Sequence, residues 1–397
     1  MDAQRLRPIN TEPLLGHPKY MKVADLNRGA FGFVQLAKNL ETGEQVAIKF
    51  IERGDKISKY VEREIMNHKQ LRHPHIVELR EVFLTPEYLA IAMEYATDGD
   101  MFQLVVRRRG LLEKDARWYF QQLIIAVDYC HRMGVANRDI KLENTLLEGT
   151  ARPIIKICDF GYSKHEVYNS APGSRVGTPA YLAPEVILTT KGKTYNAKVA
   201  DVWSCGVMLY VMLAAAYPFG RPEDEQIKPS ARMHVMLQRI LNVQYELPAH
   251  AVVTPECRDL LAQILVADPE RRISLADVQR HPWFRRDLPP GVADMNDRLL
   301  ADPSSHRSSA TQARSAPRGY YYTCCCGVQS LEETLMIVRE AMVRPQTAVL
   351  QHPLDFDNDD TLDSFIGDHG AYDDDIPYLN DDVLPFLSSR ELQQHDF

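Results

Sequence analysis

The sequence predicts an α+β fold of two lobes, with β-strands concentrated in the first lobe and α-helices in the second. Between residues 20 and 93, short apolar runs separated by turn residues are typical of strands, and one helical pattern, Ser58 to Gln70, interrupts them. Beyond residue 98 apolar residues recur at helical spacing, as from Lys114 to Met133. The predicted organisation is a flexible leader at 1–19, a domain at 20–284 (first lobe 20–93, hinge 94–97, second lobe 98–284), a linker at 285–328, a helix at 329–344 and an acidic disordered tail at 345–397.

The two ends of the chain differ from its body in composition. The leader contains Pro8, Pro13 and Pro18 and no periodic apolar pattern. The segment from Asp355 to Val383 holds eleven Asp and no Lys or Arg, so the net charge of −8 becomes −8 − (−11) = +3 for the rest of the chain. The acidity therefore belongs to the tail, and the body has no basic excess of the kind that binds nucleic acid.

No segment predicts a membrane span or export. The longest apolar run, Val207 to Tyr217, has eleven residues, which is too short to cross a bilayer and favours a buried helix. Because neither end carries a signal peptide or a lipidation motif, we expect a cytoplasmic and nuclear protein. The seven cysteines show no zinc spacing, which favours reduced thiols; the run Cys324-Cys325-Cys326 fits either a flexible insert or acylated or redox-active thiols.

The candidate chemistry lies in the stretch N-R-D-I-K-L-E-N at 137–144 and in the D-F-G tripeptide that begins at Asp159. The apolar-rich segment between them, interrupted by a turn, is typical of a β-hairpin, and a hairpin holds its two ends side by side. We therefore expect Asp139, Lys141 and Asn144 to lie beside Asp159. This cluster suits phosphoryl transfer from ATP to a hydroxyl, with a carboxylate to accept the proton, an ammonium to offset charge and two oxygen ligands, from Asn144 and Asp159, for Mg²⁺.

Together these motifs resemble the catalytic loop and the metal-binding turn of eukaryotic protein kinases. The resemblance implies a bilobal protein kinase fold over 20–284, catalytic roles for Asp139, Lys141 and Asn144, ATP and Mg²⁺ as cofactors, and protein substrates. It also implies nucleotide contacts at eight positions: Gly29, Gly32, Val34, Ala47, Lys49, Glu64, Glu94 and Ala96.

Three segments of the first lobe carry these nucleotide contacts. Gly29 and Gly32 stand in a loop between two strand patterns, where glycine lets backbone N–H groups approach phosphates. The next strand ends on Lys49, which the resemblance pairs with Glu64 on the following helix and with the α- and β-phosphates. The hinge offers backbone groups to adenine. Asn27 replaces the first glycine of the family pattern; because Asn tolerates positive φ, we expect nucleotide binding to be weakened but not lost.

Asn137 is the second departure from the family, since a His usually precedes the Arg-Asp pair and braces the metal-binding turn. The change puts efficient turnover in question, although it removes no group that takes part in the reaction. The resemblance also implies two scaffold roles: Asp201, at the start of the buried helix, holds the catalytic loop by its backbone amides, and Arg272 pairs with Glu185.

The segment between Gly161 and Glu185 is the expected site of regulation. Phosphate on Ser170 or Ser174 would add charge near −2, which Arg138 could bind. The run G-T-P-A-Y-L-A-P-E at 177–185 resembles the substrate-positioning segment of serine/threonine kinases, and the resemblance implies that Thr178 bonds to the catalytic Asp.

Further stretches narrow the resemblance. They are Phe160 to Lys164, Ala200 to Val207, Ile240 to Tyr245 and Val266 to Pro269. They are similar to the plant and green-algal sucrose-non-fermenting-related kinases of the second subfamily, which are activated by osmotic stress and, in some members, by abscisic acid. Asp100 and Glu143 fall where basophilic kinases carry acids, so we expect a basic residue before the phospho-acceptor.

The C-terminal segments complete the pattern. In the helix at 329–344, apolar residues at spacings of four, three and four form one stripe: Leu331, Leu335, Val338 and Met342. The helix resembles the subfamily's regulatory helix, which braces the helix carrying Glu64; a plain additional core helix is the alternative. The Asp-rich tail resembles the segment through which the family meets type 2C protein phosphatases, and a solvated disordered tail is the alternative.

The sequence therefore predicts a serine/threonine kinase of stress signalling that is switched on by upstream kinases. Asn27 and Asn137 keep open a pseudokinase scaffold that binds partners without efficient phosphotransfer. A third reading makes the tail a binding module and the principal function.

Overall fold

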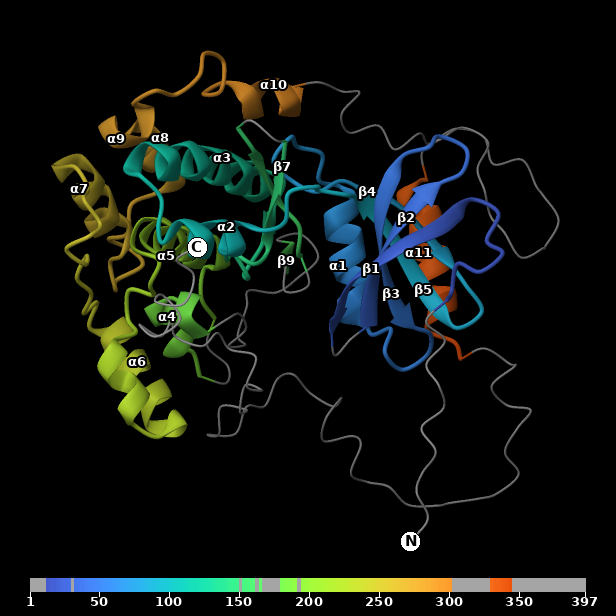
Figure 1. Ribbon diagram of the computed structural model, residues 1–397, viewed down its shortest axis with the longest axis horizontal. Coiled ribbons are helices and arrows are strands. Elements are labelled where there is room, and N and C mark those ends of the chain that lie inside the picture. The colour runs from blue at the N-terminus through green and yellow to red at the C-terminus, as the bar shows by residue number, and fades with distance from the viewer. Residues whose placement is uncertain are drawn as a thin grey trace, which may run out of the picture. The chain divides into compact units, whose positions relative to one another are not determined.

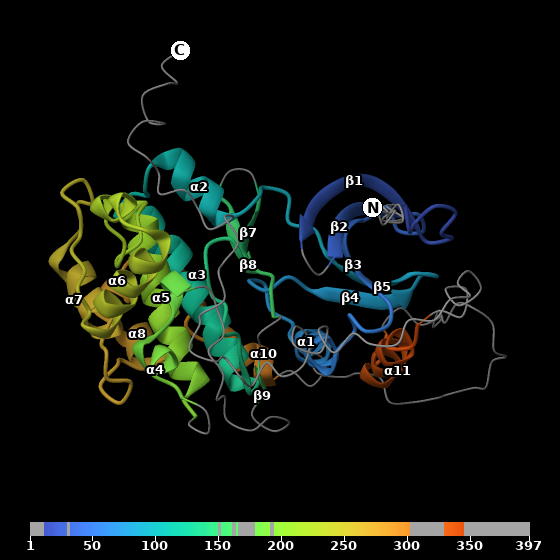
Figure 2. The ribbon, with the colours of Figure 1, turned by 90° about the horizontal axis from the view of Figure 1, so that it is seen from below.

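The computed structural model describes residues 12–29, 32–149, 152–160, 164–165, 179–190, 194–301 and 329–344. The chain divides into two compact units, shown in Figures 1 and 2. Among the described residues, the first unit comprises those up to Arg72, Val77–Ala96 and 329–344, and the second comprises His73–Ile76 and Thr97–Ala301. The main boundary, between Ala96 and Thr97, lies inside the segment expected to be a hinge.

The first unit is an antiparallel five-stranded sheet in the order β1-β2-β3-β5-β4, with two helices on one face (Figure 2). The strands are β1 (Tyr20–Gly29), β2 (Gly32–Asn39), β3 (Gln45–Glu52), β4 (Leu79–Leu84) and β5 (Tyr88–Glu94), and the helices are α1 (Lys59–Lys69) and α11 (Leu331–Ala341). Successive side chains of a strand point to opposite faces, so β3 serves two cores. Val46, Ile48 and Phe50 belong to one core, and Ile51 belongs to the other, together with Ile65 of α1.

Part of the expected leader packs on this sheet. Hydrogen bonds from Leu15 N to Glu12 O (3.1 Å) and from His17 N to Leu14 O (3.0 Å) fold residues 12–17 into turns. Leu14 is buried in the core that contains Val46, Ile48 and Phe50, and the centres of the His17 and Phe83 rings lie 4.9 Å apart. The expectation of a flexible leader is therefore wrong for residues 12–19, because one buried Leu needs no periodic pattern to be held.

α11 packs against α1, β4 and β5 of the first unit. Its capping box joins Ser330 and Glu333, and the side-chain amide of Gln329 pairs with the backbone of Val82, accepting from N at 2.9 Å and donating to O at 2.8 Å. At the other end, Gly54 N donates to Ala341 O (2.8 Å), so hydrogen bonds fix both ends of the helix.

The buried stripe of α11 differs from the predicted one. Thr334, Ile337, Val338 and Ala341 are buried, whereas Leu331, Leu335 and Met342 are only half-buried at its margins. Small and β-branched residues occupy the centre because α11 lies close to α1 and β4. Choosing apolar residues by their spacings of four, three and four therefore placed the stripe about 80° around the helix from its true centre, by the roughly 100° turn per residue of an α-helix.

The second unit is mainly helical. Its helices are α2 (Met101–Arg108), α3 (Glu113–Arg132), α4 (Pro184–Ile187), α5 (Ala197–Ala214), α6 (Pro229–Leu241), α7 (Pro255–Ile264), α8 (Leu275–Arg280), α9 (Pro282–Arg285) and α10 (Met295–Ala301), with 3₁₀ turns η1 (Pro179–Tyr181) and η2 (Pro222–Gln226). Its short strands are β6 (Val135–Ala136), β7 (Thr145–Glu148), β8 (Ile154–Ile157) and β9 (Lys164–His165), which pair as β6-β9 and β7-β8. The core is built around α3 and α5, which pack on each other.

α5 is the buried helix that the sequence predicts, with different ends. Asn196 caps it by accepting from Lys198 N (3.0 Å), so the helix begins four residues before Asp201, and it ends where Ala215 adopts a left-handed φ of 47°. Among the described residues, α5 alone is long and apolar enough to cross a membrane by length and composition, but 83% of that window is buried within the protein. Its composition is that of a core helix.

The segment expected to be a linker contains α10. Asn296 of this helix is 4% exposed and donates to Ile125 O (2.9 Å) and to Asp128 Oδ2 (2.8 Å), both on α3. Its amide oxygen also lies 3.2 Å from His73 Nε2, in the loop before β4. A buried Asn and an ion pair between Asp297 and Arg132 of α3 (2.7 Å) hold this seven-residue helix in place of a periodic apolar face, so the apolar pattern does not reveal it.

Candidate functional site

The catalytic loop and the metal-binding turn meet in the second unit through the predicted hairpin. β7 and β8 pair in the register Thr145 to Ile157, and beyond this pair Cys158 N donates to Asn144 O at 3.1 Å. Asn144 therefore lies against the residue that precedes Asp159. The hairpin predicted from the sequence is confirmed, and it brings the end of the catalytic loop to the start of the D-F-G motif.

Two side chains hold the carboxylate of Asp139. Lys141 Nζ lies 2.9 Å from Asp139 Oδ2, and Asn144 Nδ2 donates to the same oxygen at 2.8 Å and to Asp139 O at 3.1 Å. Asp139 is buried, so these contacts fix the orientation of its carboxylate. Burial by itself lowers the pKa of Lys141, but the nearby carboxylates of Asp139, Glu143 and Asp159 outweigh it and raise that pKa. Lys141 is therefore fully cationic at neutral pH.

Asp201 anchors the backbone of this loop. Its carboxylate accepts from Asn137 N (2.9 Å) and Arg138 N (2.8 Å), and it also contacts His131 Nε2 at 2.8 Å. Arg138 adopts a positive φ of 70°, a strained conformation for a residue with a side chain. The role predicted for Asp201 matches this geometry, although Asp201 lies in the second turn of α5 and not at its start.

Arg138 has a partner that the sequence did not suggest. Its Nε and Nη2 donate to the hydroxyl of Tyr195 at 3.1 and 2.9 Å, and its guanidinium lies 5.8 Å from the centre of the Tyr195 ring. Burial raises the pKa of Tyr195. No spacing rule links residues so far apart in the chain, so sequence reasoning had no signal for this pair.

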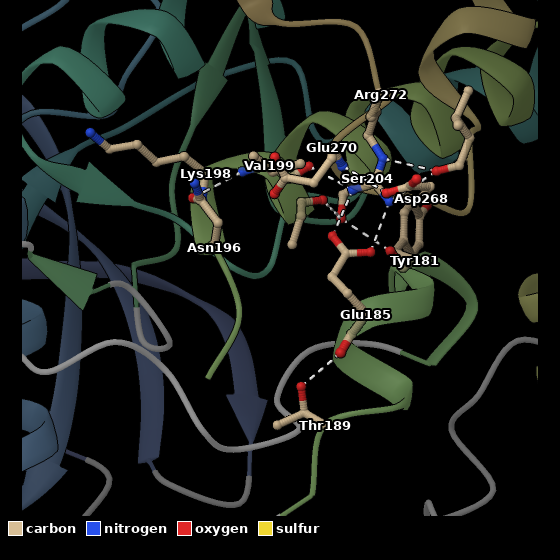
Figure 3. A network of polar contacts seen from close by, with 12 residues as sticks. Tyr181, Glu185, Thr189, Asn196, Lys198, Val199, Ser204, Asp268, Glu270 and Arg272 are labelled. Atoms are coloured by element: carbon tan, nitrogen blue, oxygen red, sulfur yellow. Dashed lines mark hydrogen bonds and ion pairs between the residues drawn. The ribbon is translucent and has the colours of Figure 1, made fainter. Parts of the chain in front are cut away.

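Arg272 and Glu185 form the predicted ion pair, shown in Figure 3 with its neighbours. The contact is bidentate: Nη1 donates to Glu185 Oε1 at 2.6 Å and Nη2 donates to Oε2 at 2.8 Å. The guanidinium also donates to the carbonyl oxygens of Val199 (2.9 Å) and Val266 (3.0 Å). Arg272 therefore ties the segment around Glu185 to α5 and to the loop before α8.

The residues expected to contact phosphate in the first unit lie on β2, β3 and α1. In the β2–β3 register, Val34 pairs with Lys49, and Ala47 comes two residues earlier on the same face as Lys49. Lys49 Nζ donates to Glu64 Oε1 at 3.0 Å. The strand and the helix thus bring together two residues that lie fifteen positions apart, as the sequence predicted.

The glycine-rich loop departs from the expectation at Asn27. Asn27 lies within β1 beside a register irregularity, its backbone has no positive φ, and its side-chain oxygen accepts from Arg28 N at 2.7 Å. The tolerance of Asn for positive φ is therefore not what this position requires. Position 32 requires glycine, because a Cβ there would lie 1.9 Å from Phe50 O. Gly29 is the cross-strand partner of Gly32.

The hinge residues lie at the end of the first unit. Glu94 N donates to Glu78 O (2.9 Å), and the Glu94 carboxylate accepts from Glu78 N (3.1 Å), so this side chain is held by the residue that precedes β4. Ala96 is buried. Their contact with adenine stays a prediction. Thr178, Ser170 and Ser174 lie outside the described residues, as do the triple cysteine and the acidic tail.

The donor chemistry at the D-F-G turn fits Mg²⁺. Both side-chain hydrogen bonds of Asn144 use Nδ2, so the amide oxygen is turned away from Asp139, and the Asp159 carboxylate belongs to the adjoining turn. Hard oxygen ligands of this kind suit Mg²⁺, which also takes oxygens from substrate phosphates. Within the described ranges, no group of three or more His, Cys, Asp or Glu gathers as a separate metal centre.

The protein kinase domain family matches residues 20–284 of this chain. The chain belongs to the protein kinase family. The serine/threonine-protein kinase SRK2E of Arabidopsis thaliana is 46% identical over 357 residues, which cover 89% of this chain and 91% of that kinase. SAPK2 of Oryza sativa subsp. indica is 51% identical over 276 residues (70% and 79%), and SRK2A of Physcomitrium patens is 46% identical over 329 residues (82% and 86%).

At this level of identity over most of the chain, the resemblance drawn from the motifs is confirmed, and the protein is a serine/threonine protein kinase. Kinases of this family use ATP and Mg²⁺ and act on proteins. In the residues described, none of the observations favours a pseudokinase: Asp139, Lys141, Asn144 and Asp159 are all present, and Asn137 makes the contact to the metal-binding turn that a His was expected to make.

Proposed function

We propose that Asp139, Lys141, Asn144 and Asp159 are the residues through which this kinase transfers the γ-phosphoryl group of MgATP to serine or threonine hydroxyls. The observation that supports this assignment is the shared contact of Lys141 and Asn144 with Asp139 Oδ2. The contact orients a carboxylate that accepts the hydroxyl proton and places an ammonium beside it. Asn144 and Asp159 hold Mg²⁺, which, when bound, neutralises charge on the phosphate oxygens.

In the first unit, Lys49 binds the α- and β-phosphates, and Glu64 orients the Lys49 ammonium. The 3.0 Å contact between Lys49 and Glu64 supports this role, since it fixes the end of a long and otherwise mobile side chain. Val34 and Ala47 share this face of the sheet and line the nucleotide, and Glu94 and Ala96 offer backbone groups to adenine.

The test is Mg²⁺-dependent transfer of labelled phosphate to a basic peptide. Asp139→Asn should lower kcat about 10²- to 10⁴-fold, the usual contribution of a positioned acid or base. Asp159→Ala should abolish transfer. Asp294→Ala, which alters an exposed Asp of the same unit, should leave activity unchanged. Wild-type protein that binds MgATP but transfers no phosphate would establish the pseudokinase alternative.

Glu143 supports a preference for arginine before the phospho-acceptor. Its Oε2 atom is buried and has no hydrogen-bond partner among the residues that the structure describes, and Oε1 is 3.5 Å from the Tyr217 hydroxyl. Burial raises its pKa, and the carboxylates of Asp139 and Asp100 raise it further. A substrate guanidinium would supply the missing donors and the opposite charge.

Glu143→Gln should therefore raise KM for an arginine-containing peptide about tenfold, which corresponds to about 1.4 kcal/mol. It should leave KM for a matched peptide without arginine unchanged. An equal rise for both peptides would mean that Glu143 supports the catalytic loop without reading the substrate.

The contacts of α11 support a regulatory role for this helix. α11 packs on α1, which carries Glu64, so removing α11 should loosen the Lys49–Glu64 pair. Deleting 329–344 should lower kcat/KM for ATP, whereas a plain core helix would lower stability alone. Upstream kinases are proposed to act on Ser170 or Ser174, which phosphosite mapping and Ser→Ala variants test.

The remaining proposals rest on composition and resemblance. The kinase acts in osmotic-stress or abscisic-acid signalling in the cytoplasm and nucleus, and its acidic tail binds type 2C protein phosphatases. Deleting 355–397 should abolish phosphatase capture and spare phosphotransfer. If the tail is instead a solvated segment, its deletion changes neither phosphatase capture nor phosphotransfer. The position of a fluorescent fusion of the kinase in the cell tests the expected cytoplasmic and nuclear location.

A further inference from the structure

The end of α2, the first turn of α3 and the connection between β7 and β8 carry a concentration of positive charge. We call it the α2–α3 basic surface, and its cations are Arg107, Arg108, Arg109, Lys114 and Arg152. All five residues are exposed, and the side chain of Arg108 keeps 54% of its area open. None of them belongs to the catalytic loop or to the predicted nucleotide contacts, so phosphotransfer does not account for them.

Contacts with α3 join two of these arginines across one patch. Arg108 Nη1 lies 3.7 Å from Asp115 Oδ2, and the guanidinium of Arg152 lies 3.8 Å from the centre of the Trp118 ring. Burial raises the pKa of Tyr119 against the opposing charges of Arg108 and Arg152, so both guanidiniums lie close to this one ring. The end of α2 and the β7–β8 connection therefore place their cations on the same stretch of α3.

Apolar area borders these cations. Lys114 lies one helical turn before Trp118 on the same side of α3, and Leu112, at the N-cap, is 66% exposed. Trp118 donates from Nε1 to Pro153 O at 3.2 Å, which fixes the ring that stacks with Arg152. The surface therefore offers positive charge beside apolar area, a combination suited to a ligand with both carboxylates and aromatic rings.

Stabilisation of α2 itself explains only part of this charge. Arg107 and Arg108 stand in the last turn of α2, where cations interact favourably with the terminal carbonyls. Arg109 follows with a φ of 53°, a conformation that favours glycine, and Lys114 and Arg152 lie outside α2. The helix end therefore gives a reason for two of the five cations.

We propose that the α2–α3 basic surface binds the acidic segment Asp355–Val383 of the same chain. This segment has eleven Asp and no Lys or Arg, so its charge is opposite to that of the surface. Aromatic residues lie between its carboxylates at Phe356, Phe365, Tyr372 and Tyr378. These rings match the apolar area beside Trp118, so the two partners are complementary both in charge and in apolar character.

The segment is tethered to the kinase, which favours binding within one molecule. An exposed ion pair contributes little by itself, but tethering raises the effective concentration of the segment to about the millimolar range, so that several weak contacts together hold it. The described part of the chain ends at Arg344, and at about 3.4 Å per residue Phe365 can lie up to about 70 Å from it. Because its carboxylates cannot serve two cationic surfaces at once, this contact competes with capture of a partner protein by the segment.

Carbodiimide cross-linking of the full-length kinase tests the contact, because it joins a lysine to a carboxylate that touches it. Mass spectrometry should find Lys114 joined to an Asp of 355–383, in higher yield than Lys228, an exposed lysine of the same unit. Raising the salt from about 0.05 to about 0.5 M shortens the Debye length from about 14 to about 4 Å, so the yield should fall several-fold without any substitution. Mixing ¹⁵N-labelled with unlabelled kinase identifies cross-links between two molecules.

The variant Arg107→Glu/Arg108→Glu/Arg152→Glu reverses three charges and leaves Lys114 in place as the cross-linking group. The yield at Lys114 should fall about tenfold, as expected when several exposed ion pairs are replaced by repulsive ones. The melting temperature should stay close to that of the wild type, because the three positions are exposed. If this variant fails to fold, the effect of salt on the wild type still decides.

The matched control is Arg258→Glu/Arg271→Glu/Arg285→Glu. It makes the same change of net charge at exposed arginines elsewhere in the second unit, and it should keep the wild-type yield at Lys114. An equal loss of yield in both variants would show that net charge alone, and not this surface, attracts the segment.

The proposal is supported by a cross-link within one chain that salt and the charge reversal weaken and the control does not. It is overturned if Lys114 forms no cross-link with the segment, or if the reversal leaves the yield unchanged. Cross-links found only between labelled and unlabelled chains would assign the surface to a second copy. Binding of the wild type, but not of the reversal variant, to phosphatidylserine vesicles without any cross-link would assign it to a lipid headgroup. None of these measurements uses phosphotransfer, so their outcome is separate from that of the proposed function.

Discussion

Replacing Arg272 by Met should destabilise the second unit, because it leaves the carboxylate of Glu185 without its partner. The side chain of Arg272 is 0% exposed and that of Glu185 is 11% exposed. The guanidinium lies 5.2 Å from the centre of the Trp203 ring, so Met keeps much of the volume and loses the charge. The carboxylate of Glu185 then remains buried without its partner, and the carbonyls of Val199 and Val266 lose a donor.

The expected loss of stability in Arg272→Met follows from the burial of this ion pair. Breaking a buried ion pair by removing one partner costs about 3 to 5 kcal/mol, because the remaining charge is uncompensated. For a unit of about 200 residues, each kcal/mol shifts the melting temperature by about 2 to 4 °C, so we expect a decrease of about 6 to 20 °C. An exposed pair behaves differently: Arg280→Met, which removes a contact to Asp277 on α8, should cost less than about 1 kcal/mol.

The assay is denaturant and thermal unfolding of Arg272→Met, of Glu185→Leu, of the double variant Arg272→Met/Glu185→Leu and of the control Arg280→Met. Because the double variant removes both charges, it should recover most of the loss, and the cycle measures the coupling between the two residues. A cost below about 1 kcal/mol for Arg272→Met, or a double variant as unstable as Arg272→Met alone, would refute the reasoning.

Three further predictions concern other parts of the chain. Glu64→Gln should lower kcat/KM for ATP about tenfold or more, since Lys49 loses the charged partner at 3.0 Å; radiometric kinetics measure this. Val338→Ala, at a position with 0% exposure in α11, should destabilise the first unit by about 2 to 3 kcal/mol in urea unfolding. Burial lowers the pKa of His73 to about 3 and the pKa of His75 to about 4. As the pH falls below about 6.5, these rings therefore take up protons in the unfolded chain but not in the folded one. The free energy of unfolding should decrease there, by up to about 1.4 kcal/mol per pH unit for each ring.

Each of these predictions has its own control. Glu62→Gln changes the neighbouring acid on α1 and should leave kcat/KM unchanged. Met336→Ala removes a larger but 56% exposed side chain from the same helix as Val338 and should cost less than Val338→Ala. His73→Gln should flatten the pH dependence of the unfolding free energy; an unchanged slope would show that His73 is not among the groups that titrate on unfolding.

The sequence was most informative where a motif of reactive residues lies in a segment whose local pattern determines the path of the chain. The hairpin between Asn144 and Asp159 could be predicted because two apolar strands separated by a turn must return the chain to its starting point. The Lys49–Glu64 pair could be predicted only through the resemblance to protein kinases, in which the lysine of this strand pairs with an acidic residue on the next helix. The strand was expected to end on Lys49, but β3 continues to Glu52.

The sequence was least informative where single residues make contacts between distant segments. Leu14 anchors the segment before β1, Asn296 anchors α10, and Tyr195 meets Arg138, yet none of them belongs to a periodic pattern. The stripe of α11 was misplaced for a related reason: close packing on α1 selects Thr334 and Ala341, whose small size carries no strong apolar signal. Contacts of this kind follow from the packed fold and not from local propensity.

The pairing of Gln329 with Val82 has a consequence for the solubility of shortened chains. β4 is an edge of the five-stranded sheet, and the Gln329 amide occupies the N–H and C=O of Val82 as a neighbouring strand would. Exposed strand edges recruit further strands from other molecules. A kinase truncated before residue 329 would therefore expose the unpaired edge of β4, and we expect it to form oligomers whose size depends on protein concentration. The same truncated chain carrying Val82→Pro should not form them, because proline removes the exposed N–H of the edge strand.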